Sequence, residues 1–362
     1  QISVCRVCYF QRIGGGIMDY SFDDIFIDDT KNVERVSSNE YLENGNIAII
    51  DQGKEQIVGY TNCEEYKICN EERIIFGDHT RIFKYVNIPF ITGADGTKVL
   101  KIKDVSKCAY KYYYYYLLHS YIPNTGYNRH FKWVKELKFK VPEISEQKEI
   151  IKKIDNVVKI IDIKKIQLDE LQNVIKSQFV EMFGNININD KKWNEDILKH
   201  NLSVIGGYAF KSSEFQESGI PILRIGNINT GKFRTKDLMF WKNDASLERY
   251  AIYPNDVLMS LTGTVGKEDY GNICIIGNDY PKYYLNQRNA KLEIKETLNK
   301  EYISYALRVP EIKRRLTGIS RGVRQANISN KDIENLRIPI PPIELQNKFA
   351  EFVKQIDKQK FE

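Results

Sequence analysis

The sequence contains the same short pattern twice, and this duplication limits the folds that the chain can adopt. Residues 137–147 read LKFKVPEISEQ and residues 336–346 read LRIPIPPIELQ, at a constant offset of 199 residues. In each copy an alternating apolar stretch, typical of a short strand, is followed by proline and then by a helical pattern. The chain is therefore predicted to consist of two related halves, each ending in a strand and a helix.

The helical pattern after the first copy continues for some forty residues and ends at Gly184. Apolar residues recur along it at heptad spacing on one seam, formed by Ile154, Ile161, Leu168, Ile175 and Met182, and on a companion seam, formed by Ile150, Val157 and Leu171. At about 1.5 Å per residue such a helix is about 60 Å long, and it needs a partner helix to bury its seam. The second copy offers Phe349, Val353 and Ile356 as that partner. The alternative is a long helix packed on a single globular domain.

Two blocks that mix short apolar β-type runs with turn residues precede the two helices, which indicates an α+β protein. The predicted domains are residues 18–142 and 185–341, with a central long helix over 143–184 and a C-terminal helix over 342–362. Residues 1–17 end in a glycine run before Met18 and are expected to be a non-native or upstream extension.

Composition excludes several classes of protein. The chain lacks a run of about 18 apolar residues, so no membrane span is expected. Six cysteines in 362 residues do not form a secreted disulfide scaffold, and Cys5 and Cys8 lack a second pair at zinc-finger spacing. We therefore expect a cytoplasmic protein that holds no metal.

Basic and amide side chains gather in two loops at corresponding places of the two halves. The first loop contains Asn128, Arg129 and His130, and the second contains Arg321, Arg324, Gln325 and Asn327. Arginine suits guanine edges and phosphates, and asparagine and glutamine suit adenine. The net charge of +6 is compatible with such a polyanionic partner. These loops are predicted to bind DNA, although for any single residue a solvated loop is an equal alternative.

The signals for catalysis are weaker. Residues 226–232 (GNINTGK) have the spacing of a phosphate-binding loop, but Phe233 stands where Ser or Thr would hold Mg²⁺. Asp279, Glu293 and Lys295 match the loose pattern of a metal-dependent nuclease, which arises easily by chance in a charged chain. A stand-alone nuclease and a scaffold that does not bind DNA remain the alternatives to a DNA reader.

Both helix starts, EISEQKEIIKKID and IELQNKFAEFVKQID, resemble those of the specificity (S) subunit of type I restriction–modification systems. Residues 77–83 (GDHTRIF), 91–96 (ITGADG) and 255–267 (NDVLMSLTGTVGK) resemble segments of that family's target recognition domains. The resemblance runs from Met18 onward. It implies two target recognition domains separated by long conserved helices that form an antiparallel coiled coil. Each domain would read one half of a bipartite target in double-stranded DNA.

The resemblance also implies partners and cofactors. The helices would dock two methyltransferase (M) subunits, and restriction (R) subunits would join through the complex. No cofactor is expected on this chain, since S-adenosylmethionine, ATP and Mg²⁺ would belong to the partner subunits and the chain itself would be non-catalytic. Near the family-like segments, four basic residues are predicted to contact phosphate: Arg81, Lys84, Lys267 and Arg288. The second helix is shorter than the family's usual one, which leaves docking through the helix pair in doubt.

Overall fold

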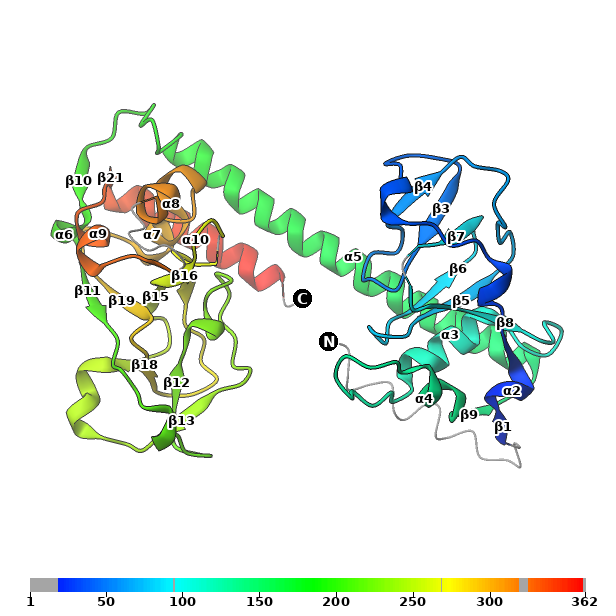
Figure 1. Cartoon of the computed structure of the whole chain (residues 1–362). Helices are drawn as coiled ribbons and strands as arrows, with labels where there is room; N and C mark the ends of the chain where they lie inside the picture. Colours follow the sequence, from blue (N-terminus) through cyan, green and yellow to red (C-terminus); the bar gives the residue numbers. More distant parts are fainter. Residues whose placement is uncertain (1–18, 94, 268, 319–324, 361–362) are drawn as a thin grey trace. The chain divides into compact units, whose positions relative to one another are not determined.

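The computed structural model describes residues 19–93, 95–267, 269–318 and 325–360. The chain forms two compact units, unit 1 (residues 1–163) and unit 2 (residues 164–362). Helix α5 (Ile144–Phe183) contributes residues to both (Figure 1). The predicted extension over residues 1–17 lies outside the described residues.

The described part of unit 1 contains a four-stranded, a three-stranded and a two-stranded sheet, with three short helices besides the first half of α5. The four-stranded sheet has the order β2 (Phe26–Asp28), β8 (Thr97–Ile102), β5 (Arg73–Gly77) and β6 (Phe83–Val86). The three-stranded sheet has the order β4 (Gly59–Thr61), β3 (Ile47–Ile50) and β7 (Phe90–Thr92), with β3 and β7 parallel. Strand β1 (Asp19–Ser21) pairs with β9 (Lys138–Lys140). The helices are α2 (Phe22–Ile25), α3 (Tyr110–His119) and α4 (Phe131–Lys135), with short 3₁₀ turns at Thr30–Asn32 and Ser38–Glu40.

Unit 2 repeats this topology with additions. Its first sheet has the order β11 (Leu202–Gly206), β19 (Asn289–Ile294), β15 (Val257–Ser260) and β17 (Ile273–Ile275). Its second has the order β13 (Met239–Trp241), β12 (Ile220–Leu223), β18 (Tyr283–Leu285) and β14 (Ala251–Ile252), with β12 and β18 parallel. Strand β10 (Glu195–Ile197) pairs with β21 (Arg337–Pro339), and β16 (Thr262–Thr264) pairs with β20 (Gln325–Asn327). The helices are α6 (Leu198–Asn201), α7 (Lys300–Ala306), α8 (Pro310–Thr317), α9 (Asn330–Glu334) and α10 (Ile343–Gln359), with 3₁₀ turns at Ser212–Glu214, Ile225–Asn227 and Ala245–Tyr250.

The duplication extends to individual hydrogen bonds. Gln147 and Gln346 occupy the same place in the two sequence copies, and both are fully buried. The Gln147 side chain accepts from the backbone N–H of Ala109 at 2.9 Å and donates to two carbonyls, one of them that of Pro142. Gln346 accepts from the N–H of Asn299 at 2.8 Å and also donates to two carbonyls. Each glutamine therefore ties the start of its helix to the loop before α3 or α7.

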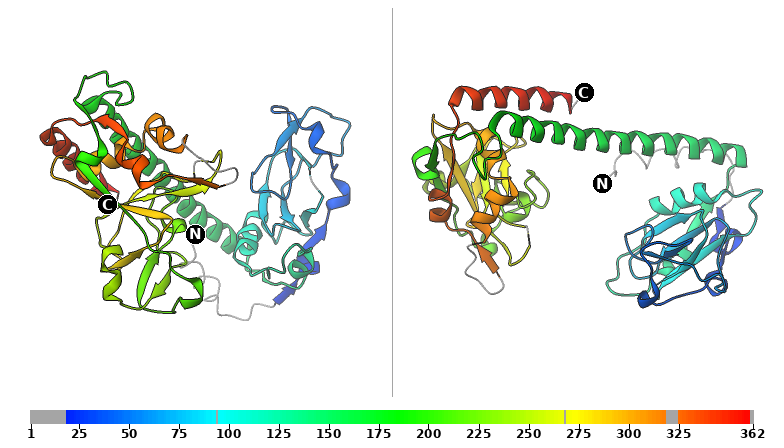
Figure 2. Two further views of the ribbon diagram at one scale, coloured as in Figure 1. Left: turned by 60° about the vertical axis from the view of Figure 1, so that its left-hand side comes forward. Right: turned by 90° about the horizontal axis from the view of Figure 1, so that it is seen from above.

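Helix α5 is covered only at its two ends. Ile150 belongs to the core of unit 1, and Ile175, Phe179 and Phe183 belong to the core of unit 2. Within unit 2, α10 runs back along α5 (Figures 1 and 2), and Phe349 contacts Phe179 and Phe183 at centroid distances of 5.4 and 5.5 Å.

The antiparallel pairing is confirmed there, but the predicted seam is not buried along the whole helix. Val157 and Leu168, which were expected in it, are 54% and 41% exposed, because α10 is shorter than α5. Despite the length of α5, none of the described helices is long and apolar enough to cross a membrane.

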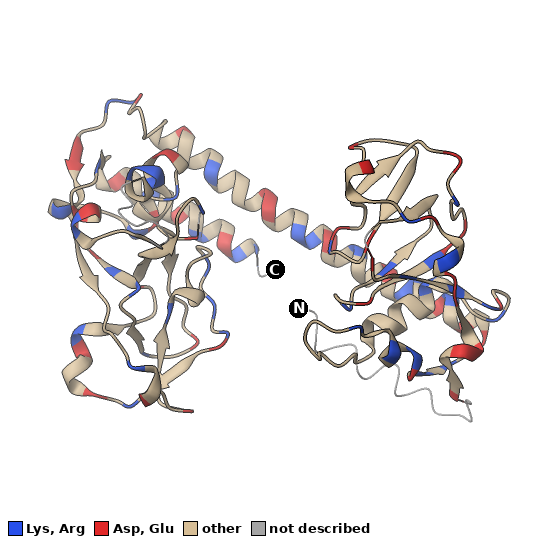
Figure 3. Ribbon diagram, viewed as in Figure 1, with Lys and Arg blue, Asp and Glu red and all other residues tan. Residues whose placement is uncertain are grey.

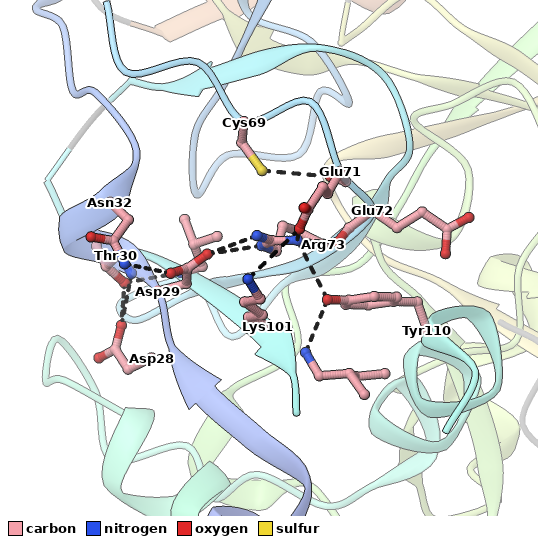
Figure 4. A network of polar contacts seen from close by, with 12 residues as sticks. Asp28, Asp29, Thr30, Asn32, Cys69, Glu71, Glu72, Arg73, Lys101 and Tyr110 are labelled. Carbon is pink, nitrogen blue, oxygen red and sulfur yellow. Dashed lines mark hydrogen bonds and ion pairs between the residues drawn. The ribbon is translucent and has the colours of Figure 1, made fainter. Parts of the chain in front are cut away.

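A buried ion pair connects the start of the inner strand β5 with the residue that follows β2 in unit 1 (Figure 4). Arg73 at the start of β5 is 4% exposed, and its Nη2 lies 2.9 Å from Oδ2 of the buried Asp29. The same guanidinium donates to the Glu71 carboxylate at 2.9 Å and to the Tyr110 hydroxyl at 3.4 Å. Because that hydroxyl accepts from the backbone of Ile102, the network joins β5, β8 and α3.

Candidate nucleic-acid interface

In each unit, polar loops meet where a pair of parallel strands ends. The carboxyl ends of parallel neighbours lie at the same edge of a sheet, so the loops that follow them are adjacent. In unit 1 these loops follow β3 and β7, and in unit 2 they follow β12 and β18. The family-like segments 77–83, 91–96 and 255–267 all reach these two edges.

Gln52 joins three loops at the edge of unit 1. It follows β3, and its Nε2 donates to the carbonyl of Asp95 at 2.7 Å. Its Oε1 accepts from the backbone N–H of His79 at 3.1 Å. The backbone carbonyl of Gln52 accepts from the Thr80 hydroxyl. The loops after β3, β5 and β7 are therefore held together by one side chain.

The predicted loop of unit 1 lies against this cluster. The Tyr127 ring stacks on the His79 imidazole at a centroid distance of 5.0 Å and is 90% exposed. Asn128 and Arg129 follow it and are exposed, and Arg129 lies 3.7 Å from the Asp95 carboxylate. A flat aromatic face, an amide and a guanidinium thus share one surface. Tyr127 is not among the residues predicted from the sequence, although a tyrosine in a polar, glycine-containing loop is a signal that the sequence carries.

Two predicted contact residues are withdrawn from solvent. His130 has no exposed surface, and its Nδ1 lies 2.9 Å from the carbonyl of the buried Asp78, whose carboxylate accepts from the N–H of Phe131 at 2.6 Å. Lys84 is 3% exposed and lies 3.5 Å from Asp51, and burial lowers its pKa. Both side chains therefore support the loops and are inaccessible to a DNA phosphate.

Arg81 is half-buried and is also used structurally. It adopts a left-handed conformation with φ of 61°, and its Nη1 donates to the carbonyl of Ile122 at 3.2 Å. This bond anchors the connection that leads to Tyr127. Arg81 thus positions the loop. The other N–H groups of its guanidinium are the donors that would bind a phosphate in the predicted contact.

In unit 2 the predicted loop pairs with the family-like segment 255–267. The β16–β20 ladder places Thr262 opposite Asn327 and Thr264 opposite Gln325. The Asp269 carboxylate accepts from the N–H and the hydroxyl of Thr264 at 2.9 and 3.1 Å, and the backbone donor is the main reason that its pKa is lowered. Asn327 is exposed on this ladder, whereas Arg321 and Arg324 lie outside the described residues.

Arg288 lies beside the same ladder. Its carbonyl accepts from the N–H of Leu261 at 2.8 Å, which brings the loop after β18 next to β16. Its exposed side chain lines a cavity of about 330 Å³ together with Thr262, Thr264 and Asp269. Lys267 is exposed at the tip that follows β16, where its N–H donates to the Thr264 carbonyl at 3.0 Å.

Two residues of the nuclease alternative, Glu293 and Lys295, are engaged in separate contacts. The Lys295 ammonium donates to the carbonyls of Lys199 and His200, and Glu293 accepts from the Ser203 hydroxyl. Among the described residues no group of three or more His, Cys, Asp or Glu side chains is arranged to hold a metal ion. Residues 226–232 begin in a 3₁₀ turn rather than leading into a long helix, unlike a phosphate-binding loop.

The sequence matches known proteins over most of its length. The family model described as "Type I restriction modification DNA specificity domain" matches residues 16–173 and 183–362. The MjaVIII specificity subunit of a type I restriction enzyme from Methanocaldococcus jannaschii is 27% identical over 62% of this chain. The EcoKI specificity subunit from Escherichia coli is 24% identical over 60% of it. The matched regions span 56% and 49% of those two relatives, so the chain covers about half of their length.

The fold is also found among solved structures. The crystal structure of the S subunit of a type I restriction–modification system from M. genitalium superposes with a TM-score of 0.58 at 17% identity, covering 96% of this chain and 92% of that one. At this identity the likeness shows a shared fold. Both halves of the sequence are matched by the family model, and both repeat one topology. The chain belongs to the family of type I restriction–modification DNA specificity proteins.

Proposed function

We propose that the chain is the DNA-reading subunit of a type I restriction–modification complex, and that it is not itself catalytic. Each unit reads one half of a bipartite target through the loops gathered at its parallel-strand edge. The observation that carries this proposal is that both units expose amide, basic or aromatic groups at the same topological place, with Tyr127, Asn128 and Arg129 in unit 1 and Asn327 and Arg288 in unit 2.

The two edges carry different side chains, so the two half-sites should differ in sequence. The test is selection of duplexes from a random-sequence pool by the full chain, with and without its methyltransferase subunits. We expect enrichment of two unlike half-sites with a constant gap. A single continuous site, or no enrichment at all, would contradict the proposal.

Two controls separate the alternatives. Incubation of the purified chain with plasmid DNA and Mg²⁺ should leave the plasmid intact, whereas cutting would support the nuclease. Binding should weaken steeply as salt rises, since displaced counterions accompany each phosphate contact. Binding that is absent even at low salt would support a scaffold that does not bind DNA.

We further propose that the middle of α5 docks the methyltransferase subunits. Its exposed apolar residues are Val157, Ile160, Ile163, Ile166 and Leu168. Basic and acidic side chains are interspersed with them along the helix (Figure 3). Replacing Ile160 by Glu should abolish co-purification with the methyltransferase subunit, whereas the same change at the exposed Lys159 should not. S-adenosylmethionine, ATP and Mg²⁺ would bind to partner subunits, so calorimetric titration of this chain alone with S-adenosylmethionine should show no binding.

A further inference from the structure

The largest cavity described in unit 2 is basic and lies at the edge where β12 and β18 end. Its volume is about 640 Å³. The charged side chains that line it are Arg224, Arg234, Lys236, Asp237 and Arg288. Four cations thus face one space with a single carboxylate. Within the described part of the chain, none of the four lies within ion-pair distance of a carboxylate, so a bound anion would reduce their mutual repulsion.

One buried side chain assembles this cavity. Asn227 is 3% exposed, and its Oδ1 accepts from the backbone N–H of Arg224 at 2.9 Å. Its Nδ2 donates to the carbonyls of Arg234 and Lys236 at 2.9 and 3.1 Å. A single amide therefore holds the backbones of three of the four basic residues in place. Such preorganisation lowers the cost of ordering them around a ligand.

Arg224 carries an unused donor at this place. Its Nη2 donates to the carbonyl of Asp237 at 2.8 Å, but its buried Nε has no hydrogen-bond partner among the described residues. A buried guanidinium N–H without an acceptor is costly, so Arg224 is held at the cavity wall with its hydrogen-bonding capacity only partly used. Guanidinium groups also match phosphate oxygens in geometry and charge.

The same place in unit 1 is built differently. There the residues after the parallel strand β3 are Asp51 and Gln52, and Asp51 is paired with Lys84. The loop after β7 contributes Asp95 in place of Arg288. Among the described residues, the cavity at this edge of unit 1 is lined by Asp78 and Asp95 as well as by Arg35, Lys98 and Arg129, so the excess of cations in the unit 2 cavity is not a consequence of the shared fold.

The cavity also adjoins the ladder at which unit 2 is proposed to read bases. Ile225 and Arg288 line both this cavity and the smaller one beside β16. A DNA strand whose bases lie at Asn327 would have its sugar–phosphate backbone beside Arg288. The volume is sufficient for a phosphodiester group together with its sugar.

We propose that the cavity lined by Arg224, Arg234, Lys236 and Arg288 binds a backbone phosphate of the DNA strand that unit 2 reads. This inference rests on the proposed function. It assigns phosphate contacts to three residues that the sequence did not single out, Arg224, Arg234 and Lys236. It also makes Asn227 the positioning residue of the contact.

The test compares the salt dependence of DNA binding among variants of the full chain. Arg288→Gln and Lys236→Gln should each flatten the slope of log affinity against log salt by about one, with equal losses on the selected and a scrambled duplex. Both side chains are exposed, so these variants should fold. Lys199→Gln, which removes an exposed charge from α6 of the same unit, should leave the slope unchanged. Unchanged slopes in every cavity variant would overturn the proposal.

Phosphate ethylation locates the contact. In the wild-type complex, ethylation of particular phosphates beside the unit 2 half-site should prevent binding. In the Arg224→Gln variant, ethylation of one of those phosphates should no longer prevent binding. Arg234→Gln replaces this variant if Arg224→Gln does not fold. An unchanged interference pattern would contradict the cavity as its site.

Two further outcomes distinguish a failure of the proposed function from a failure of the proposed phosphate site. If the wild-type chain selects no sequence but still binds duplexes through the cavity residues, the proposed function fails and the phosphate site survives. If the cavity binds inorganic pyrophosphate and DNA does not displace it, the site belongs to a free anion and the inference is wrong.

Discussion

At the scale of the residue, exposure decides which side chains can reach a partner. Tyr127 and His130 lie three positions apart in one loop, yet the first is 90% exposed and the second is fully buried. The same contrast holds between Arg288, which is exposed, and Lys84, which is not. Contacts with DNA are therefore expected from Tyr127 and Arg288, and structural effects from His130 and Lys84.

Replacing Tyr127 by Ala should weaken DNA binding without affecting folding. Loss of an aromatic side chain that is an anchor of an interface costs about 2 kcal/mol or more of binding free energy. Because the ring is 90% exposed, the free energy of unfolding should change by less than about 0.5 kcal/mol. Fluorescence anisotropy with a duplex containing the unit 1 half-site measures the first quantity, and urea unfolding measures the second. Tyr121→Ala, which removes a ring that is 82% exposed, is the matched control, and equal losses of binding in both variants would argue against a specific DNA contact of Tyr127.

Replacing Arg73 by Met should destabilise the chain strongly. The change leaves Asp29 buried without its partner, and removing one member of a buried ion pair costs about 3–5 kcal/mol. The control is Arg35→Met, which breaks the exposed pair with Asp95 and should cost about 0–1 kcal/mol. Urea unfolding of both variants checks the difference, and a loss of similar size in the two would show that burial of the Arg73 network is unimportant.

At the scale of the element, the two helix starts are stabilised in the same way. Gln147 and Gln346 each satisfy one backbone N–H and two carbonyls from a fully buried position. These bonds connect the proline stop, the helix start and the preceding loop. They explain why glutamine recurs at the end of both copies of the repeat.

Replacing either glutamine by Ala should cost about 1–3 kcal/mol, since buried polar groups lose their partners. Hydrogen exchange should localise the effect, with faster exchange in α3 for Gln147→Ala and in α7 for Gln346→Ala. Gln167→Ala, at an exposed position in the middle of α5, should leave both regions unchanged. Exchange that rises equally in the two units for each variant would contradict this equivalence.

At the scale of the whole molecule, α5 is one continuous helix of 40 residues that takes part in the cores of both units. Its middle contributes few side chains to either core, because Val157, Ile160 and Ile166 are each more than half exposed. We therefore expect that shortening this helix leaves the loops at the two parallel-strand edges unaltered.

Deleting residues 156–162 should shorten the gap between the half-sites and leave their sequences intact. Seven helical residues span about 10.5 Å and almost two full turns. The apolar face of the helix after the deletion therefore points in nearly the same direction as in the wild type. At about 3.4 Å per base pair the gap should shrink by about three base pairs. Selection from a random pool measures both gap and half-sites, and altered half-sites with an unchanged gap would show that α5 does not act as the spacer.

The sequence by itself determined the elements whose signals are local or repeated. The duplication, the α+β composition, the extent of α5 and the start of α10 were readable because heptad spacing and proline stops act over a few residues. It also predicted two DNA-binding loops, because glycine, amides and arginines cluster in them, and this stays a prediction.

Only the tertiary structure decided which of those side chains face solvent. His130 is buried through contacts with Asp78, 52 residues earlier, and Arg288 shares a cavity with Arg224, Arg234 and Lys236 because β12 pairs with β18. Neither contact follows a local spacing. Burial depends on partners distant in sequence, and a pattern of neighbouring residues carries no information about which of them will meet.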